Sequence, residues 1–171
     1  MTSIVRADIN EAELLSKLAK ITFIESHGSS AKLEDINNYV KEKYNAATLR
    51  EELKDLENIY HAIYHNSKLV GYSKIIFNSP YADSSMKNIA KLERLYLLKE
   101  VYNLKLGLSL FQFNYELAKS NNQLGMWLYV WKENSRAISF YQKVGFQIIG
   151  NYNFKISETH SNPNYQLFLL F

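Results

Sequence analysis

Residues 124–154 place a strand, a helix and a second strand in one short run, and this run restricts the fold more than any other segment. LGMWLYVW (124–131) is almost continuously apolar, as buried strands are. In ENSRAISFYQKVG (133–145), Asn134 stands where a helix is capped and Gly145 where one ends. FQIIGNYNF (146–154) is rich in β-branched and aromatic residues. These patterns predict a helix between two strands of a sheet.

The N-terminal third of the chain is predicted to be mainly helical. TSIVRA (2–7) predicts a short strand, and helices are expected over residues 11–26, 33–44 and 46–56. Asn10 followed by Glu13 offers the first of these helices a capping box. The apolar residues expected mostly on one side of this helix are Leu14, Leu18, Ile21 and Phe23.

The period of the apolar pattern then changes from helical to extended. Residues 58–66 and 69–78 predict two strands joined by the tight turn NSK, and residues 89–98 and 164–171 predict two more. A further helix is expected over residues 104–120. Helices therefore come first, a meander of strands follows, and two strand-to-helix units fill the second half. We predict a mixed α/β (α+β) fold in a single domain, residues 1–171.

Composition and charge exclude several classes of function. Of 171 residues, 47% are hydrophobic and 22% charged, and the net charge of +3 has no basic block, so we expect no nucleic-acid partner. The absence of cysteine excludes disulfides, a thiol nucleophile and a Cys-ligated zinc site. No window approaches the roughly 20 apolar residues of a membrane span. We expect a cytoplasmic protein without a membrane partner.

Two histidines have a spacing that invites a metal hypothesis. His61 and His65 are four residues apart, which would suit a metal ion on a helix. They lie in a predicted strand, however, and no carboxylate or third histidine is close in sequence. We therefore expect no metal.

The run from Trp127 to Gly150 carries a family resemblance. Its residues fit the pattern N-x-x-A-x-x-F-Y-x-x-x-G-F at Asn134, Ala137, Phe140, Tyr141, Gly145 and Phe146. The chain here resembles the GNAT superfamily of N-acetyltransferases, which use acyl-coenzyme A. The resemblance implies acetyl-CoA as cosubstrate. It also implies a mostly antiparallel sheet of about seven strands, with helices on both faces and a splay between the fourth and fifth strands.

The preceding segment extends the resemblance and also departs from it. LERLYLLKE (92–100) is similar to the family's fourth strand, which leads into a phosphate-binding loop of the form Q/R-x-x-G-x-G/A. Aligned without gaps, that loop and the helix start after it fall on Tyr102, Asn103, Leu104, Lys105, Leu106, Gly107 and Leu108. Only Gly107 matches. Lys105 replaces the first glycine, and Asn103 is a residue that tolerates left-handed backbone.

The resemblance also implies roles for individual residues. Backbone groups of Leu95, Tyr96 and Leu97 would bind the pantetheine arm, with the Leu97 N–H as an oxyanion donor. Tyr141 matches the general acid that would protonate the thiolate. Asn134 either caps its helix or binds the pantetheine arm, and both roles can coexist.

The identity of the general base stays open, because two interpretations of Glu93 are possible. Glu93 lies near where many relatives carry a carboxylate that acts through water. A glutamate beside Arg94 on an exposed strand end is also the pattern of a surface charge.

Segments outside the core look like the PaiA-type branch, which includes polyamine acetyltransferases. They are residues 22–28, 34–44, 49–53, 69–78 and 127–134. The expected reaction is direct acetyl transfer to the primary amine of a small molecule, such as a polyamine. No covalent enzyme intermediate is expected, because the chain has no cysteine and no serine in a nucleophile motif. Acidic stretches in residues 34–44 and 50–57 could attract a cationic amine or could simply be solvated helix faces.

Two alternative functions and the oligomeric state stay open. The altered loop is compatible with a GNAT-fold ligand-sensing or interaction module that binds coenzyme A weakly or not at all. A protein Nα-acetyltransferase would need a peptide groove. The chain is rich in aromatics, with 13 Tyr and 9 Phe, but nothing marks an interface, so a homodimer is one option for its oligomeric state.

Overall fold

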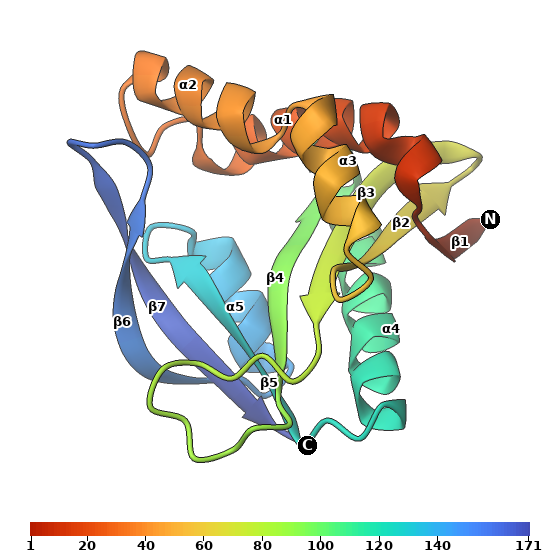
Figure 1. Cartoon of the computed structure of the whole chain (residues 1–171), viewed down its shortest axis with the longest axis vertical. Helices are drawn as coiled ribbons and strands as arrows, with labels where there is room; N and C mark the ends of the chain where they lie inside the picture. The colour runs from red at the N-terminus through yellow and green to blue at the C-terminus, as the bar shows by residue number, and fades with distance from the viewer.

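The computed structural model describes all residues, 1–171, and is built around one seven-stranded sheet in the order β1-β2-β3-β4-β5-β7-β6 (Figure 1). The strands are β1 (Thr2–Arg6), β2 (Ile59–His65), β3 (Lys68–Ile76), β4 (Ala90–Leu97), β5 (Gly125–Trp131), β6 (Gln147–Lys155) and β7 (Ser161–Leu170). Every pairing is antiparallel except β4 with β5, which is parallel. The predicted mostly antiparallel sheet is confirmed.

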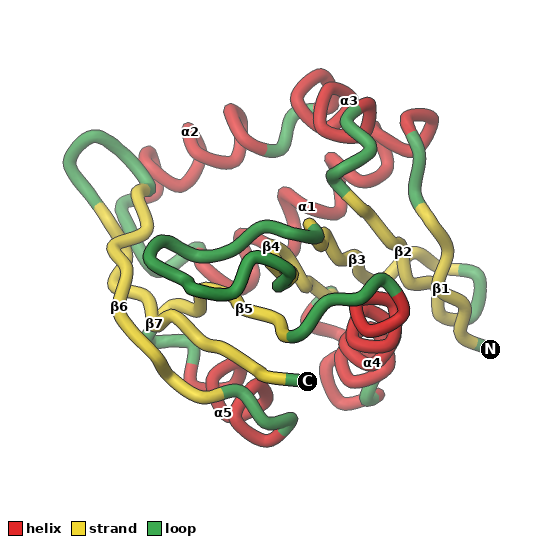
Figure 2. Tube along the Cα trace, turned by 60° about the horizontal axis from the view of Figure 1, so that its bottom comes forward, coloured by secondary structure: helices red, strands yellow, loops and turns green.

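Helices cover both faces of the sheet, as Figures 1 and 2 show. They are α1 (Ala12–His27), α2 (Leu33–Lys43), α3 (Ala46–Lys54), α4 (Leu106–Ser120) and α5 (Ser135–Lys143), with short 3₁₀ helices at Ile9–Glu11 and Lys99–Leu104. One core cluster joins α1, α2 and α3 to β2 and β3, and another joins α4 and α5 to β4, β5 and β7. None of the helices is both long and apolar enough to cross a bilayer.

The start of α1 differs from the sequence prediction. The capping box is formed by Asp8 and Glu11, not Asn10 and Glu13, because a 3₁₀ turn precedes the α-helix and moves the cap two residues upstream. Leu14 and Ile21, expected on the apolar side, are exposed. The buried face follows helical spacing instead at Leu15, Leu18, Ala19, Thr22 and Phe23, in which small residues complete the stripe.

The start of the last strand also differs from the prediction, whereas the end of α5 does not. The last strand, β7, begins at Ser161 rather than residue 164, and it includes Pro163. The missing N–H of Pro163 is tolerated because the β5–β7 pairing ends at Trp131 and Asn164. The end of α5 is as predicted: Gly145 has a φ of 111°, and the N–H groups of Gly145 and Phe146 donate to Gln142 and Tyr141.

The parallel pair β4–β5 separates early. Only Ala90 with Met126 and Lys91 with Trp127 are paired, and from Leu92 onward the side of β4 that faces β5 has no partner strand. The predicted splay between the fourth and fifth strands is therefore confirmed. On the other side of β4, the N–H of Leu98 donates to Val70 of β3 at 2.8 Å. Because strand N–H groups alternate in direction, the N–H of Leu97 points into the gap.

Candidate active site

The loop between β4 and α4 keeps a glycine-like turn without the glycine. Lys105 has a φ of 58° and a ψ of 14°, a left-handed conformation that costs a non-glycine residue roughly 1–2 kcal/mol. Asn103, which could have taken that conformation, lies in the 3₁₀ helix instead. The α-helix consequently starts at Leu106, two residues later than predicted. Lys105 thus occupies the backbone position that a glycine would fill.

Gly107, the one glycine of the loop pattern that the chain retains, brings α4 close to β4. A Cβ built at this position would lie 3.1 Å from Cδ1 of Leu97, closer than ordinary van der Waals contact. The N-terminus of α4 is thereby held beside the strand that borders the gap. Its first N–H groups lack intrahelical partners and favour an anion.

A cavity of about 630 Å³, here called the loop cavity, opens between this loop, β4 and α5. The backbone contacts predicted from the sequence border it at Leu95, Tyr96 and Leu97, as do the loop residues Tyr102, Lys105, Gly107 and Leu108. Its charged lining consists of Lys105, Arg136 and Lys143 against Glu25. This excess of positive charge next to a helix N-terminus suits a phosphate-bearing ligand.

Asn103, Leu104 and Leu106 do not line the loop cavity. Asn103 and Leu104 belong to the 3₁₀ helix, and Leu106 is buried in the core cluster that also contains Val101 and Leu110. These three positions shape the turn rather than border the cavity.

Arg136 is a residue of this cavity that the sequence reasoning missed. Its Nη2 donates to the carbonyl oxygen of Tyr102 at 2.8 Å, and its guanidinium lies 3.9 Å from the centre of the Tyr102 ring. The contact joins the first turn of α5 to the 3₁₀ helix between β4 and α4. Its position between the motif residues Asn134 and Ala137 was the available signal.

Asn134 and Tyr141 line the loop cavity and also a second cavity. The Oδ1 of Asn134 accepts from the N–H of Ala137 at 3.2 Å, so the residue caps α5, and its Nδ2 group remains available to a ligand. Tyr141 is 9% exposed, and burial raises the pKa of its phenol. The phenol is therefore protonated at neutral pH and can donate a hydrogen bond.

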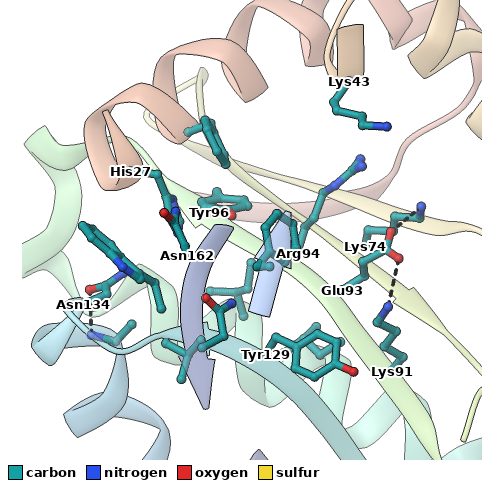
Figure 3. A pocket seen from close by; sticks show the side chains of 18 of the residues that line it. His27, Lys43, Lys74, Lys91, Glu93, Arg94, Tyr96, Tyr129, Asn134 and Asn162 are labelled. Atoms are coloured by element: carbon teal, nitrogen blue, oxygen red, sulfur yellow. Dashed lines mark hydrogen bonds and ion pairs between the residues drawn. The ribbon is translucent and has the colours of Figure 1, made fainter. Parts of the chain in front are cut away.

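The second cavity, here called the charged cavity, has a volume of about 390 Å³ and lies between β4, β5 and the helices α1, α2 and α3 (Figure 3). Its ring-bearing walls are Phe23, His27, Tyr39, Tyr44, Tyr96, Tyr129, Trp131, Tyr141 and Phe154. Burial lowers the pKa of His27 to about 4, so this residue is neutral at pH 7. The charged side chains of the cavity are Lys43, Glu52, Lys74, Lys91, Glu93 and Arg94.

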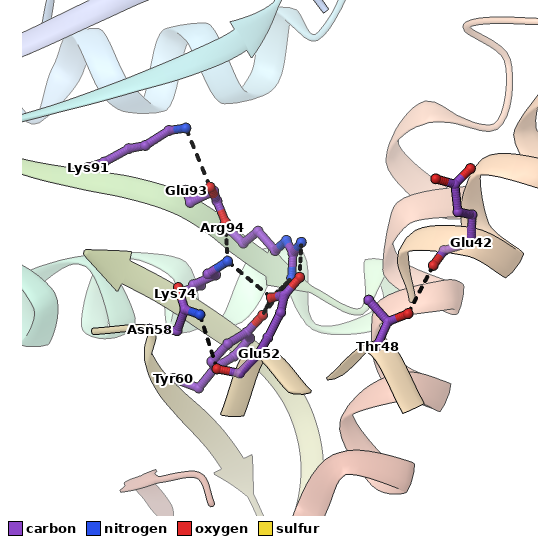
Figure 4. Close-up of polar contacts among 9 residues, drawn as sticks. All are labelled: Glu42, Thr48, Glu52, Asn58, Tyr60, Lys74, Lys91, Glu93 and Arg94. Carbon is purple, nitrogen blue, oxygen red and sulfur yellow. Dashed lines mark hydrogen bonds and ion pairs between the residues drawn. The ribbon is translucent and has the colours of Figure 1, made fainter. Parts of the chain in front are cut away.

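Five of these charged groups form one network (Figure 4). Lys74 reaches Glu52 at 3.0 Å and Glu93 at 2.5 Å. Arg94 contacts Glu52 through Nη1 at 3.1 Å and Nη2 at 3.3 Å, and Lys91 reaches Glu93 at 3.4 Å. Burial alone would raise the pKa of both carboxyl groups, but the cations outweigh it and lower both pKa values. Both glutamates are therefore ionised at neutral pH.

A bulge in β4 aims two consecutive charged residues at this cavity. Lys74 pairs with Arg94 while Ile75 pairs with Leu92, so Glu93 has no partner in β3. Glu93 is consequently not the exposed charge at a strand end that one reading of the sequence suggested: its side chain is 26% exposed and ion-paired. Its catalytic role stays a prediction.

Glu52 and Lys74 were not singled out from the sequence as parts of a site. The available signal was Lys74 within the apolar strand segment YSKIIF, since a lysine is rarely buried unless it is paired. Of the acidic stretches in α2 and α3, only Glu52 lines the charged cavity. Glu51 instead pairs with Lys54 on the surface.

The sequence and the fold can be compared with those of known proteins. The family model described as "Acetyltransferase (GNAT) family" matches residues 24–146. The chain belongs to the GNAT acetyltransferase family.

Relatives of this GNAT N-acetyltransferase cover nearly its whole length. A spermidine N(1)-acetyltransferase from Thermoplasma acidophilum is 27% identical over 84% of the chain and 86% of the relative. An uncharacterised N-acetyltransferase in the pepI 3′ region of Lactobacillus delbrueckii subsp. lactis is 24% identical over 92% of both chains. The crystal structure of a PaiA N-acetyltransferase from T. acidophilum in complex with coenzyme A superposes with a TM-score of 0.81, at 23% identity over 100% and 99% of the two chains.

The two histidines at metal-like spacing have separate surroundings in this GNAT protein. His61 is buried and packs edge-on against Phe113, with ring centres 4.7 Å apart. His65 contacts the hydroxyl of Thr2 at 2.9 Å. No group of three or more His, Asp or Glu side chains is arranged to hold a metal ion.

Proposed function

We propose that this GNAT N-acetyltransferase transfers an acetyl group from acetyl-CoA directly to the primary amine of a small molecule. The observation that carries the proposal is the meeting of the two cavities. Both are lined by Leu95, Tyr96, Asn134, Ala137 and Tyr141, at the place where β4 and β5 part. A donor in one cavity and an acceptor in the other would bring their reacting atoms together there, and such positioning lowers the barrier of a two-substrate reaction.

The loop cavity fits the cosubstrate. Lys105, Arg136 and Lys143 would attract its phosphates together with the N-terminus of α4. The free edge of β4 offers backbone groups to a pantetheine arm, and the Nδ2 group of Asn134 can add a hydrogen bond. Bound acetyl-CoA would supply an activated thioester at the junction of the cavities.

Two groups of the chain can assist the transfer. The N–H of Leu97 faces the gap, where it can donate to the oxygen that becomes negative during attack. Tyr141 can donate a hydrogen bond to the departing sulfur. Burial raises the pKa of its phenol, which makes it a weaker acid than the thiol, so it suits stabilisation of the thiolate by a hydrogen bond better than complete proton transfer. In the reaction the amine nitrogen bonds the acetyl carbon while the carbon–sulfur bond breaks. The amine loses one proton and the sulfur gains one.

Glu93 is the candidate base of the proposal. It is ionised and lines the cavity in which the amine would lie. Lys74 at 2.5 Å and Lys91 at 3.4 Å lower its pKa and therefore its basicity. A carboxylate held in this way suits relay through water better than direct proton abstraction.

The acceptor class is suggested by a relative. The Thermoplasma acidophilum protein that is 27% identical is a spermidine N(1)-acetyltransferase, which makes polyamines the first acceptors to test.

Cofactor binding and turnover test the proposal separately. Calorimetric titration with acetyl-CoA should show binding, and thiol release should then follow addition of an amine from a panel of polyamines, amino acids and short peptides. No binding at millimolar acetyl-CoA would refute the proposed activity. Binding without thiol release for any amine would instead favour the ligand-sensing module.

A further inference from the structure

The charged cavity carries more positive than negative charge. Four cationic side chains line it, against two carboxylates, and His27 is neutral at pH 7. Glu42 does not line the cavity, but its carboxylate lies 3.3 Å from the ammonium of Lys43 and offsets that one positive charge. An acceptor that enters this cavity therefore meets a positive environment, which repels a polycation and attracts an anion.

Neither carboxylate is free to receive the ammonium group of a substrate. Glu52 is held by Arg94, by Lys74 and by the hydroxyl of Tyr60. Glu93 is held by Lys74 and Lys91. A polyamine could bind either one only by displacing a paired cation, which would leave a buried charge without its partner.

Two lysines, in contrast, are loosely paired. Lys91 is 3.4 Å from Glu93, whereas Lys74 holds the other oxygen of that carboxylate at 2.5 Å. The ammonium of Lys91 instead lies over aromatic rings, 5.1 Å from the centre of Trp127. Lys43 pairs only with Glu42, and both side chains are largely exposed, a type of pair worth little energy. Both lysines line the cavity, and Figure 3 shows Lys91 joined to Glu93 and Lys43 with no contact drawn.

We infer that the acceptor carries an anionic group, a carboxylate or a phosphate ester, in addition to its reacting amine. Lys91 inside the cavity and Lys43 at its rim are the cations that bind this group. The inference rests on the proposed acetyl transfer and narrows its acceptor from amines in general to zwitterionic ones. The aromatic walls accommodate the uncharged body between the two groups.

Matched pairs of acceptors test the inference. Lysine is cadaverine with an added carboxylate, ornithine stands in the same relation to putrescine, and phosphoethanolamine is ethanolamine with an added phosphate. The measurement is kcat/KM for each compound and for spermidine, with thiol release from acetyl-CoA as the signal. The anionic member of at least one class of pair should be preferred by about tenfold or more, the ratio that 1.4 kcal/mol produces. The two classes distinguish carboxylate from phosphate.

Charge variants test whether the preference for anionic acceptors depends on the lysines of the charged cavity. Lys43→Glu or Lys91→Gln should reduce the preference about tenfold, and Lys43→Glu should also raise the rate with spermidine. Lys41→Glu makes the same charge change on an exposed residue of α2 that does not line the cavity, so it should leave the preference unchanged. Lys87→Gln is the corresponding control for Lys91, since Lys87 does not line the cavity either.

Binding without turnover separates this inference from the proposed activity. Lysine, cadaverine, phosphoethanolamine and ethanolamine are titrated into the protein saturated with coenzyme A and followed by calorimetry. Selective binding of an anionic member, with no thiol release for any amine of the panel, would uphold the anion-binding role of the cavity and refute acetyl transfer. Faster acetylation of spermidine and cadaverine than of every anionic acceptor would overturn the inference and leave the transfer standing. A preference that neither Lys43→Glu nor Lys91→Gln changes would overturn it as well.

Discussion

The two cavities that meet where β4 and β5 part are built from different parts of the chain. The loop cavity consists of the end of β4, the loop after it, and α5, with Glu25 and Ser26 of α1 at its edge. The charged cavity draws its network from α3, β3 and β4, so that Glu52 meets Arg94 across 42 positions of sequence. A cavity built mostly from two short segments of the chain suits a ligand common to a family, whereas a cavity of long-range side-chain pairs can change its acceptor by substitution alone.

The largest effect should come from breaking the network of the charged cavity. Arg94→Met removes the cation that contacts both oxygens of Glu52 and leaves that carboxylate with Lys74 and the hydroxyl of Tyr60. We expect a loss of about 3 kcal/mol in the free energy of unfolding, the lower end of the range for a broken buried pair, because a mostly buried carboxylate loses one of its two cationic partners. Urea unfolding measures this change.

A surface pair provides the control for Arg94. Arg50 lies 3.9 Å from Glu13, and both side chains are largely exposed. Arg50→Met should cost about 0–1 kcal/mol. Equal losses for the two variants would show that the network contributes no more than a surface contact.

Removal of the Tyr141 hydroxyl should affect the reaction and not the fold. This residue belongs to both cavities, so Tyr141→Phe tests the junction itself. We expect kcat to fall about 100-fold, the lower end of the usual range for general acid–base groups, with the acetyl-CoA Kd unchanged. Tyr115→Phe is the control, since Tyr115 packs on Phe111 and Phe171 outside both cavities. An unchanged kcat in Tyr141→Phe would remove this residue from the mechanism.

The same contrast explains what could be predicted from the sequence. Asn134, Tyr141 and Gly145 lie within twelve residues, and their spacing reports a helix with a cap and an end, so the strand–helix–strand unit was predictable. The splay was implied only by the family resemblance. The network was not predictable, because no local pattern links Glu52 to Lys74, 22 positions away. The Glu93 bulge and the conformation of Lys105 depend on tertiary packing that propensity does not encode.

Acid should weaken the charged cavity in a pH range set by its glutamates. The folded-state pKa of Glu52 lies below its ordinary value of 4.5, because Arg94, Tyr60 and Lys74 together outweigh burial. The ionised form therefore contributes stability that is complete above about pH 4.5 and is lost as the pH falls through the lowered pKa. Glu52→Gln should cost about 1.5–3 kcal/mol at pH 7, and progressively less below pH 4.

The difference in the free energy of unfolding between the wild type and Glu52→Gln isolates the contribution of Glu52. Burial lowers the pKa of His27 and of His61 from 6.5 to about 4, so their protonation also reduces the free energy of unfolding as the pH falls through this range. The wild type and Glu52→Gln both contain these histidines, so their contribution cancels in the difference. The measurement is the free energy of unfolding from pH 7 to pH 3. A difference that stays constant over this range would show that the contribution of Glu52 does not depend on its charge.

The smallest expected effect concerns Lys105, where the loop cavity combines backbone strain with a useful charge. Lys105→Gly removes both the strain at φ 58° and the cation, whereas Lys105→Ala removes the cation alone. We expect Lys105→Gly to be about 1 kcal/mol more stable than Lys105→Ala, since glycine adopts left-handed backbone without penalty. Both variants should bind acetyl-CoA a few-fold more weakly than the wild type at low salt, with the deficit shrinking as salt screens the phosphate contact. If Lys105→Gly bound acetyl-CoA more tightly than the wild type, the lysine would be an obstruction in the loop, and the phosphate contact would belong to Arg136, Lys143 and the helix N-terminus.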